Sequence, residues 1–141
     1  MNILKPRFRR TLLKQRPGQI EDQFHDLVTV VTQDATSRTV LMVAFTDEAG
    51  YLETIRTKRA VYYSTSRHER WCKGETSGDY QYVVDVLIDC DGDALIYLVE
   101  QQGEGACHTK ADSCFYRNVN GGMLMLAPGA TSKDDLETIE I

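Results

Sequence analysis

The sequence predicts a mainly β fold with minor helices, arranged as a compact two-sheet or barrel-like domain. Short β-branched runs alternate with turn residues along most of the chain, and only one segment shows a clear helical period. The length of 141 residues suits one domain with a single core. No apolar run is long enough to span a membrane and no signal peptide is recognisable, so we expect a cytoplasmic protein with no membrane partner.

Two apolar runs in the first third of the chain predict a β-hairpin. Residues 27–33 read LVTVVTQ, residues 39–45 read TVLMVAF, and the polar stretch DATSR separates them. The period then changes, and Thr46 can cap a helix over residues 47–57 whose first turn carries two acids. We therefore expect a hairpin followed by one helix.

The second half of the chain predicts further strands. Residues 60–65 read AVYYST, and after a polar loop residues 80–90 and 94–101 read as two strands joined tightly at Asp91 and Gly92. Then follow a loop at 103–113, a short strand at 114–117, a Gly-Gly turn into MLMLA and a capped turn near 132–136.

Charge is distributed unevenly along the chain. The net charge is −5, yet the first six charged residues are all basic, namely Lys5, Arg7, Arg9, Arg10, Lys14 and Arg16. All 21 acidic residues follow them, which argues against a broad nucleic-acid surface. We expect residues 1–26 to form a solvated basic segment or a short surface helix, with a targeting or binding tail as the alternative.

The stretch DCDGD carries three aspartates at alternate positions, Asp89, Asp91 and Asp93. If the preceding strand stays extended to Cys90, the thiol leaves on one face and the carboxylates leave on the other. Three carboxylates at one spot repel unless a cation lies among them, which favours octahedral Mg²⁺. Two alternatives stay open: a solvated Asp-rich turn, and an EF-hand loop, against which Ala94 at the required glycine position argues.

The four cysteines are too irregularly spaced for a disulfide framework or a zinc ribbon. Cys90, Cys107 and Cys114 together offer three thiolates, which would leave zinc an open fourth position where a water molecule becomes a nucleophile. His108 is then a candidate acid or base and not a ligand, and Cys72 is expected not to bind zinc. The alternative is that each thiol is an inert core residue.

A polar loop at residues 64–79, STSRHERWCKGETSGD, gathers cations, hydroxyls and glycines around Trp71. Basic side chains and backbone amides near Gly74 and Gly78 could bind phosphate, and the indole ring could stack on a base. The glycine–lysine–hydroxyl order of a P-loop is absent. The alternative is a polar surface loop with a buried tryptophan.

Five motifs in order, WCKGETSG, DCDGDAL, LVEQ, ACHT and SCFYR, resemble the phosphoribosyl-AMP cyclohydrolase family of histidine biosynthesis. The resemblance covers residues 27–117, which would be the catalytic domain, with 118–141 as a C-terminal strand and tail of that domain. It implies an intertwined homodimer that shares its zinc site between subunits.

The resemblance also implies roles for individual residues. Zinc would be bound by Cys90, Cys107 and Cys114, and Mg²⁺ by Asp89, Asp91 and Asp93. His108 matches a functionally important histidine of the family. The candidate substrate-binding residues are Arg67, Trp71, Lys73, Gly74, Glu75, Thr76 and Ser77.

The implied reaction is hydrolytic opening of the purine N1–C6 bond of 1-(5-phosphoribosyl)-AMP by a zinc-activated water molecule. The product would be the formimino-AICAR ribonucleotide, at the third step of histidine biosynthesis. Asp79 departs from the Asn or His that the family commonly has there, and it adds an acid near the expected phosphate pocket. Family members with a fused pyrophosphatase domain are longer, and the 24 residues after Arg117 predict a monofunctional chain.

Two other functions were weighed. A zinc nucleobase deaminase is rejected on spacing, because Glu69 follows His68 directly and no Pro-Cys-x-x-Cys element exists. A metal-stabilised binding module is the non-enzymatic alternative, which a closed four-ligand zinc site without turnover would favour.

Overall fold

The computed structural model describes residues 2–103, 112–120 and 136–141. Within these ranges the fold is mainly β with one short helix, as the sequence predicted. The elements in chain order are β1 (Arg9–Leu12), β2 (Phe24–Asp34), β3 (Val40–Thr46), α1 (Glu48–Thr57), β4 (Val61–Ser64), β5 (Glu69–Cys72), β6 (Gln81–Ile88) and β7 (Ala94–Gln101). No helix in the described part of the chain has both the length and the apolar character needed to cross a membrane.

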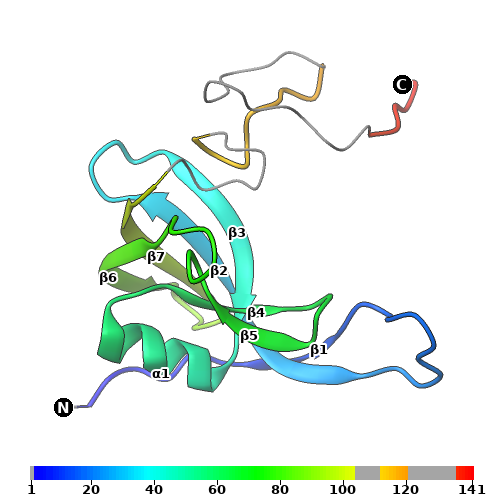
Figure 1. Ribbon diagram of the computed structural model, residues 1–141, viewed down its shortest axis with the longest axis horizontal. Helices are drawn as coiled ribbons and strands as arrows, with labels where there is room; N and C mark the ends of the chain where they lie inside the picture. The colour runs from blue at the N-terminus through cyan, green and yellow to red at the C-terminus, as the bar shows by residue number, and fades with distance from the viewer. Residues whose placement is uncertain (1, 104–111, 121–135) are drawn as a thin grey trace.

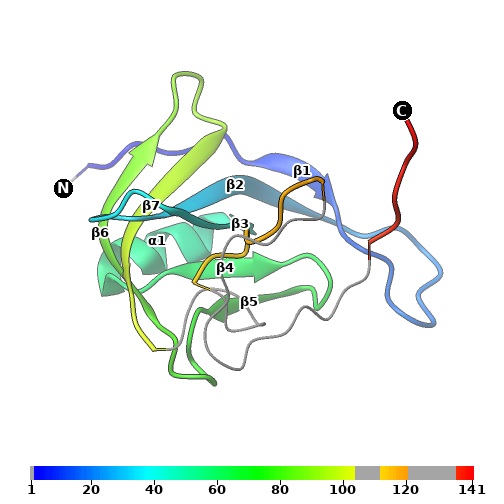
Figure 2. The same ribbon diagram turned by 90° about the horizontal axis from the view of Figure 1, so that it is seen from above.

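The strands form one sheet that curls into a half-barrel, with α1 beside its lower end in Figure 1. The strand order is β5-β4-β3-β2-β7-β6, and β1 pairs with β2 off this path. The β2–β7 pair is parallel and the other pairs are antiparallel. The ribbon formed by β1 and the start of β2 extends away from the body of the domain (Figures 1 and 2).

Both predicted hairpins are present. β2 pairs with β3 across the DATSR turn, where the Asp34 carboxylate accepts the backbone N–H groups of Thr36 and Ser37 at 2.9 and 2.8 Å. The N–H of Ser37 contributes most to lowering the pKa of Asp34, against a smaller opposing effect of desolvation. Strands β6 and β7 pair across Asp91 and Gly92, whose φ of 79° suits a tight turn.

The helix begins one residue later than predicted, because Asp47 and not Thr46 is its N-cap. The Asp47 carboxylate accepts the Gly50 N–H at 2.8 Å. Thr46 is the last residue of β3, and its buried hydroxyl donates to the Val61 carbonyl at 3.0 Å. The helix ends at Lys58, which has a left-handed φ of 62°.

Three short segments differ from the predictions. The basic segment contains strand β1 and no surface helix, since its backbone pairs with the first half of β2. The polar loop contains β5, which pairs with β4. Residues 114–117 form no strand, although the Cys114 N–H donates to the Leu41 carbonyl at 2.7 Å. The expected turns and strand at 121–135 lie outside the described residues.

Strand β6 ends at Ile88 and not at Cys90, and a bulge between Val83 and Asp85 interrupts its register. A bulge places two residues opposite one, so the alternation predicted for the whole strand changes faces at this point. Val83, Val86 and Ile88 accordingly all face the core. Strict alternation along residues 82–90 would have placed Val83 on the face opposite to Val86 and Ile88, so the predicted alternation is wrong. Cys90 and the three aspartates lie in or beside the turn that follows.

The core lies inside the curl of the sheet. Its fully buried side chains include Val30, Tyr62, Leu95, Tyr97 and Val99, which come from β2, β4 and β7. Partly buried Trp71 packs against this cluster, with its ring 5.2 Å from the ring of Tyr62. The core therefore supports β5 and the segment that follows it.

Asp47 joins three elements through charged contacts. The Asp47 carboxylate lies 3.0 Å from His25 Nε2 of β2 and accepts Arg70 Nε of β5 at 3.1 Å. The residue is only 5% exposed. Desolvation raises the pKa of Asp47, but hydrogen bonds from His25, Gly50 and Arg70 together outweigh it, so the net pKa is lowered.

We predict that Asp47→Asn removes a pH-dependent part of the stability. A lowered pKa in the folded state means that the ionised carboxylate stabilises the fold above its ordinary pKa of 3.8 and that this contribution is lost as the pH falls below it. Asparagine keeps the capping acceptor and removes the charge. Urea unfolding of both proteins should show a difference at pH 7 that shrinks toward pH 3. Asp22→Asn, at an exposed site, is the control, and a pH-independent difference for Asp47→Asn would contradict the prediction.

Candidate active site

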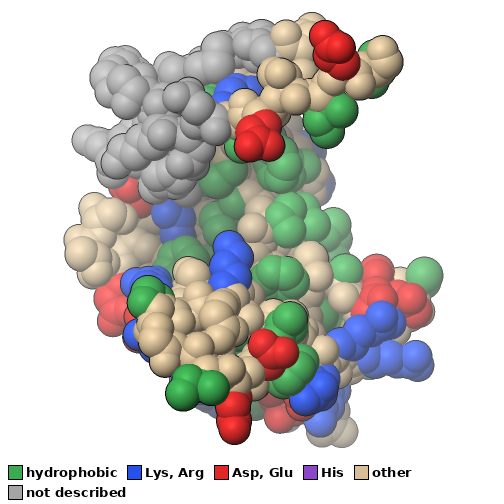
Figure 3. Space-filling view, turned by 90° about the vertical axis from the view of Figure 1, so that its right-hand side faces the viewer, with side chains coloured by type: hydrophobic (Ala, Val, Ile, Leu, Met, Phe, Trp, Pro, Cys, Tyr) green, Lys and Arg blue, Asp and Glu red, His purple; other side chains and the backbone are tan. Residues whose placement is uncertain are grey.

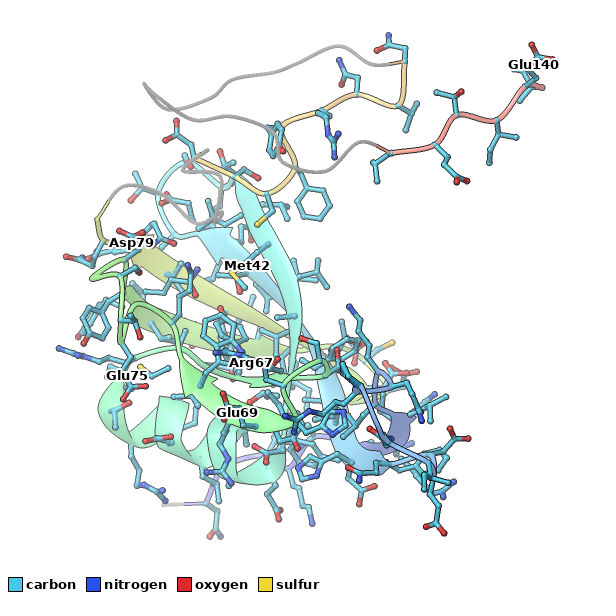
Figure 4. All side chains as sticks on the ribbon, turned by 45° about the vertical axis from the view of Figure 1, so that its right-hand side comes forward. Met42, Arg67, Glu69, Glu75, Asp79 and Glu140 are labelled. Carbon is cyan, nitrogen blue, oxygen red and sulfur yellow. The ribbon has the colours of Figure 1, made fainter. Side chains whose placement is uncertain are left out.

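A cleft of about 770 Å³ lies between the β4–β5 hairpin and the turn that follows β5. All seven candidate substrate-binding residues line it: Arg67, Trp71, Lys73, Gly74, Glu75, Thr76 and Ser77. Figure 4 labels Arg67 and Glu69 on the hairpin side, and Glu75 and Asp79 on the side of the turn. The structure thus gathers the seven residues around one cavity, and their contact with a substrate stays a prediction.

The cleft is of mixed charge. Besides the predicted residues, Glu69, Arg70, Cys72 and Asp79 line it, so three cations face three carboxylates. Arg67 pairs with Glu69 at 3.5 Å, and Arg70 is held by Asp47. Lys73 makes no ion pair with any described residue, which leaves its ammonium group available to an anion. The buried carboxylate of Asp79 adds the acid that the sequence led us to expect here.

The sequence-based prediction missed Glu69 and Cys72 as cleft residues, and it counted Arg70 only among the basic side chains gathered around Trp71. These side chains lie on β5, a strand that the sequence reading treated as loop. The signal that could have revealed them is the pairing of two adjacent four-residue runs, VYYS and ERWC, across a polar turn. Cys72 is half-buried, and desolvation, followed by the charge of Glu75, raises the pKa of its thiol.

The turn after β5 closes on itself around Gly74. The Gly78 N–H donates to the Gly74 carbonyl at 2.8 Å, and the Asp79 N–H donates to Ser77 Oγ at 3.1 Å. Gly74 has a φ of +88°, and a Cβ there would overlap the backbone of Asp79 and Tyr80. The N–H groups of Thr76 and Ser77 have no acceptor among the described residues, so they can donate to a bound group.

We predict that Gly74→Ala disrupts this turn and that Gly78→Ala is tolerated. Both glycines have a left-handed φ, so alanine is strained at either position by about 1 kcal/mol. Only at Gly74 does the added Cβ also meet backbone, whereas nothing lies within 4 Å at Gly78. Urea unfolding should give a loss of about 3 kcal/mol or more for Gly74→Ala and about 1 kcal/mol for Gly78→Ala. Equal losses would contradict the closed geometry.

The three aspartates gather at the turn between β6 and β7, with one oxygen of each within 4.8 Å of the others. Asp89 Oδ1 accepts the N–H groups of Asp93 and Ala94 at 2.9 and 3.3 Å. Arg9 of β1 reaches the turn and contacts Asp93 Oδ2 at 2.9 Å. The turn therefore joins carboxylates with one counter-charge from the N-terminal ribbon.

The carboxylates perturb one another. Desolvation raises the pKa of Asp89, but hydrogen bonds from Asp93 and the Ala94 N–H outweigh it and lower the net pKa. Hydrogen bonding and repulsion from Asp91 and Asp89 raise the pKa of Asp93. Several closely spaced, exposed carboxylate oxygens are the donor set that Mg²⁺ takes in proteins, so the residues fit the ion.

Cys90 and Cys114 are both exposed but lie at different levels along β2. Cys90 lies in the turn before β7, whose first residue, Ala94, pairs with Thr29 of β2. The Cys114 N–H donates to the Leu41 carbonyl, and the neighbouring residue Val40 pairs with Gln33 of β2. Thr29 and Gln33 are four residues apart, which corresponds to about 13 Å along an extended strand. Thiolates bind zinc at about 2.3 Å, and the described part of the chain does not bring Cys90 and Cys114 this close to one point. Cys107 and His108 lie outside the described residues.

Comparisons with known proteins identify relatives of the chain. The family model for phosphoribosyl-AMP cyclohydrolase matches residues 42–116. The phosphoribosyl-AMP cyclohydrolase of Methanothermobacter thermautotrophicus is 48% identical over 114 residues, which are 81% of this chain and 82% of that protein. The one of Halobacterium salinarum is 53% identical over 100 residues, 71% and 77% of the two chains.

A bifunctional relative matches over part of its length. The histidine biosynthesis bifunctional protein HisIE of Deinococcus radiodurans is 58% identical over 91 residues, which are 64% of this chain and 41% of that protein. The matched residues of the family model include the cleft, the acidic turn and Cys114. On these similarities, the chain belongs to the phosphoribosyl-AMP cyclohydrolase family.

Proposed function

We propose that this chain hydrolyses the N1–C6 bond of 1-(5-phosphoribosyl)-AMP and releases the formimino-AICAR ribonucleotide in histidine biosynthesis. Membership of a hydrolase family with this name supports the activity. The observation that carries the assignment to particular residues is the single cleft around residues 67–79. We propose further that the enzyme acts in the cytoplasm.

The cleft suits a nucleotide with two phosphates. Its volume of about 770 Å³ lies within the range of small-molecule sites. The Lys73 ammonium and the N–H groups of Thr76 and Ser77 can bind phosphate oxygens. Trp71 has one face on Tyr62 and lines the cleft, so its indole can stack on the purine.

Ring opening adds water at C6 and breaks the C6–N1 bond. Substitution at N1 makes the purine amidinium-like, which leaves C6 electron-poor. Zinc held by Cys90, Cys107 and Cys114 would lower the pKa of a bound water molecule and so supply the nucleophile near neutral pH. His108 would deliver a proton to the departing N1, and the cleft would hold the ring in place.

We propose a homodimer in which the zinc ligands come from two chains. The distance of about 13 Å along β2 between the levels of Cys90 and Cys114 supports this arrangement. Exposed apolar side chains support an interface as well, since Val40, Val43 and Phe115 are 40%, 48% and 53% exposed. Hydrophobic side chains gather in the middle of the face drawn in Figure 3.

Mg²⁺ is proposed to bind Asp89, Asp91 and Asp93. The hard oxygen donors suit this ion, whereas thiolates suit zinc, so the two metals need not compete for ligands. The exposed position of Asp89 and Asp91 leaves room for the water molecules that Mg²⁺ keeps.

The decisive experiment combines a metal analysis with an ultraviolet assay of purine ring opening. Replacing Cys90, Cys107 or Cys114 by serine should abolish activity and lower the zinc content, because a hydroxyl is a poor substitute for a soft thiolate. Cys72→Ser is the matched control and should change neither. Full zinc binding without turnover in the wild type would favour a binding module. Zinc loss in Cys72→Ser would contradict the ligand set.

His108→Ala separates catalysis from metal binding. If the imidazole delivers a proton, the variant should keep the dimer and its zinc while kcat falls by about 10²–10⁴-fold. The loss should fall on kcat more than on substrate binding. Zinc loss, or full activity, in this variant would overturn the role.

The shared site is tested by complementation. Inactive Cys90→Ser and Cys107→Ser proteins should regain part of their activity when they are unfolded and refolded together. A mixed dimer of these chains would hold one intact ligand set and one doubly damaged set if Cys90 and Cys107 of each set come from different chains. Two Cys90→Ser preparations treated in the same way are the control. Absence of recovery despite mixed dimers, verified by mass spectrometry, would count against this arrangement.

A further inference from the structure

A chain of hydrogen-bonded polar side chains crosses the core toward the cleft. The hydroxyls of Thr32 on β2 and Tyr62 on β4 lie 2.7 Å apart, and Tyr62 donates to Gln81 Oε1 on β6. Gln81 Nε2 then donates to Gln101 Oε1 at the end of β7, at 3.0 Å. Thr32, Tyr62 and Gln81 are 0% exposed, so the chain links four strands where water does not reach.

Gln101 connects this chain to the backbone beside the cleft. Its amide nitrogen lies 3.0 Å from the Asp79 carbonyl, 3.2 Å from the Tyr80 carbonyl and 2.9 Å from the Gln102 carbonyl. The Gln102 N–H also donates to the Tyr80 carbonyl at 2.7 Å. One side chain therefore joins the end of the cleft turn to the residues that follow β7.

The two backbone segments touch one residue further on. Gly103 has a φ of +76°, and a Cβ there would overlap the Asp79 carboxylate and lie 2.9 Å from Asp79 Cα. Gly103 is the last described residue before residues 104–111, and Cys107 and His108 follow it by four and five positions in the sequence. The chain at Gly103 is thus held against the cleft turn.

We propose that Gln101 is a positioning residue for the reaction, because its amide holds the end of the substrate cleft against the chain leading to Cys107 and His108. The inference rests on the proposed function, in which the cleft binds the substrate, Cys107 binds zinc and His108 protonates N1. A displacement of about 1 Å between a bound substrate and a catalytic group can cost about 10²-fold in rate. Gln101 acts through the backbone that it holds.

Gln101→Glu tests the role with little change of shape. Glutamate keeps the acceptor for Gln81 but replaces the donor with an oxygen that repels three carbonyls. Gln102→Glu is the matched control, since it brings the same charge to the adjacent residue, whose exposed side chain makes no hydrogen bond among the described residues. We expect kcat to fall roughly tenfold to a hundredfold in Gln101→Glu, with a smaller change in KM and faster release of zinc to a chelator. Gln102→Glu should match the wild type.

A purely structural role predicts a different result. Gln101→Glu would then melt at a lower temperature, while kcat and zinc release at 25 °C stayed equal to those of Gln102→Glu, and this outcome would overturn the inference. If the glutamate variant does not fold, Gln101→Met, of similar length and uncharged, is compared with Gln102→Met on the same readouts. A wild-type chain that lacks zinc and turnover contradicts the proposed function itself. An active zinc-bound wild type with unaffected Gln101 variants contradicts only the positioning role.

Discussion

Strand β2 is the element on which the rest of the structure depends. Its eleven residues pair with β1 at one end and with β3 and β7 along the remainder, whereas each of the other described strands has one or two partners. β3 runs antiparallel to β2 and begins beside Gln33, whereas β7 runs parallel to β2 and begins beside Thr29. The acidic turn, beside Thr29, and the Leu41 contact of Cys114, beside Gln33, consequently lie at different levels along the same strand. The proposed need for a second chain follows from this one strand.

The fold was predictable where local chemistry and tertiary pairing agree. The two hairpins have apolar strands and turn-forming residues, and both appear as expected. β5 was missed because two of its four residues are charged and its conformation depends on pairing with β4. The bulge in β6 was equally hidden, since the apolar residues on either side of Asp85 look the same with or without an extra residue in the strand. Thr46 and Asp47 can both cap a helix, and only the bond from Thr46 to Val61 distinguishes them.

The site was predictable to the extent that it is contiguous in sequence. The seven cleft residues lie within eleven positions, so one turn brings them together. The contacts of Asp47 with His25 and Arg70 join residues 22 and 23 positions apart, and no local pattern indicates them. The series of hydrogen bonds that ends at Gln101 was equally unpredictable, because its residues come from four strands whose order in the sheet is set by tertiary structure. If two chains supply the zinc ligands, as proposed, the complete ligand set cannot be predicted from the fold of one chain.

The contact between Arg9 and Asp93 gives the acidic turn a resident counter-ion. The guanidinium lies beside the carboxylates, yet hydrogen bonding and repulsion from Asp91 and Asp89 still raise the pKa of Asp93. The arginine side chain is 70% exposed, so this surface pair is weakly held. A divalent ion bound at the turn, as proposed, would therefore exchange with a weakly held monovalent group. Because Arg9 lies on β1, this exchange would link occupancy of the turn to the N-terminal ribbon.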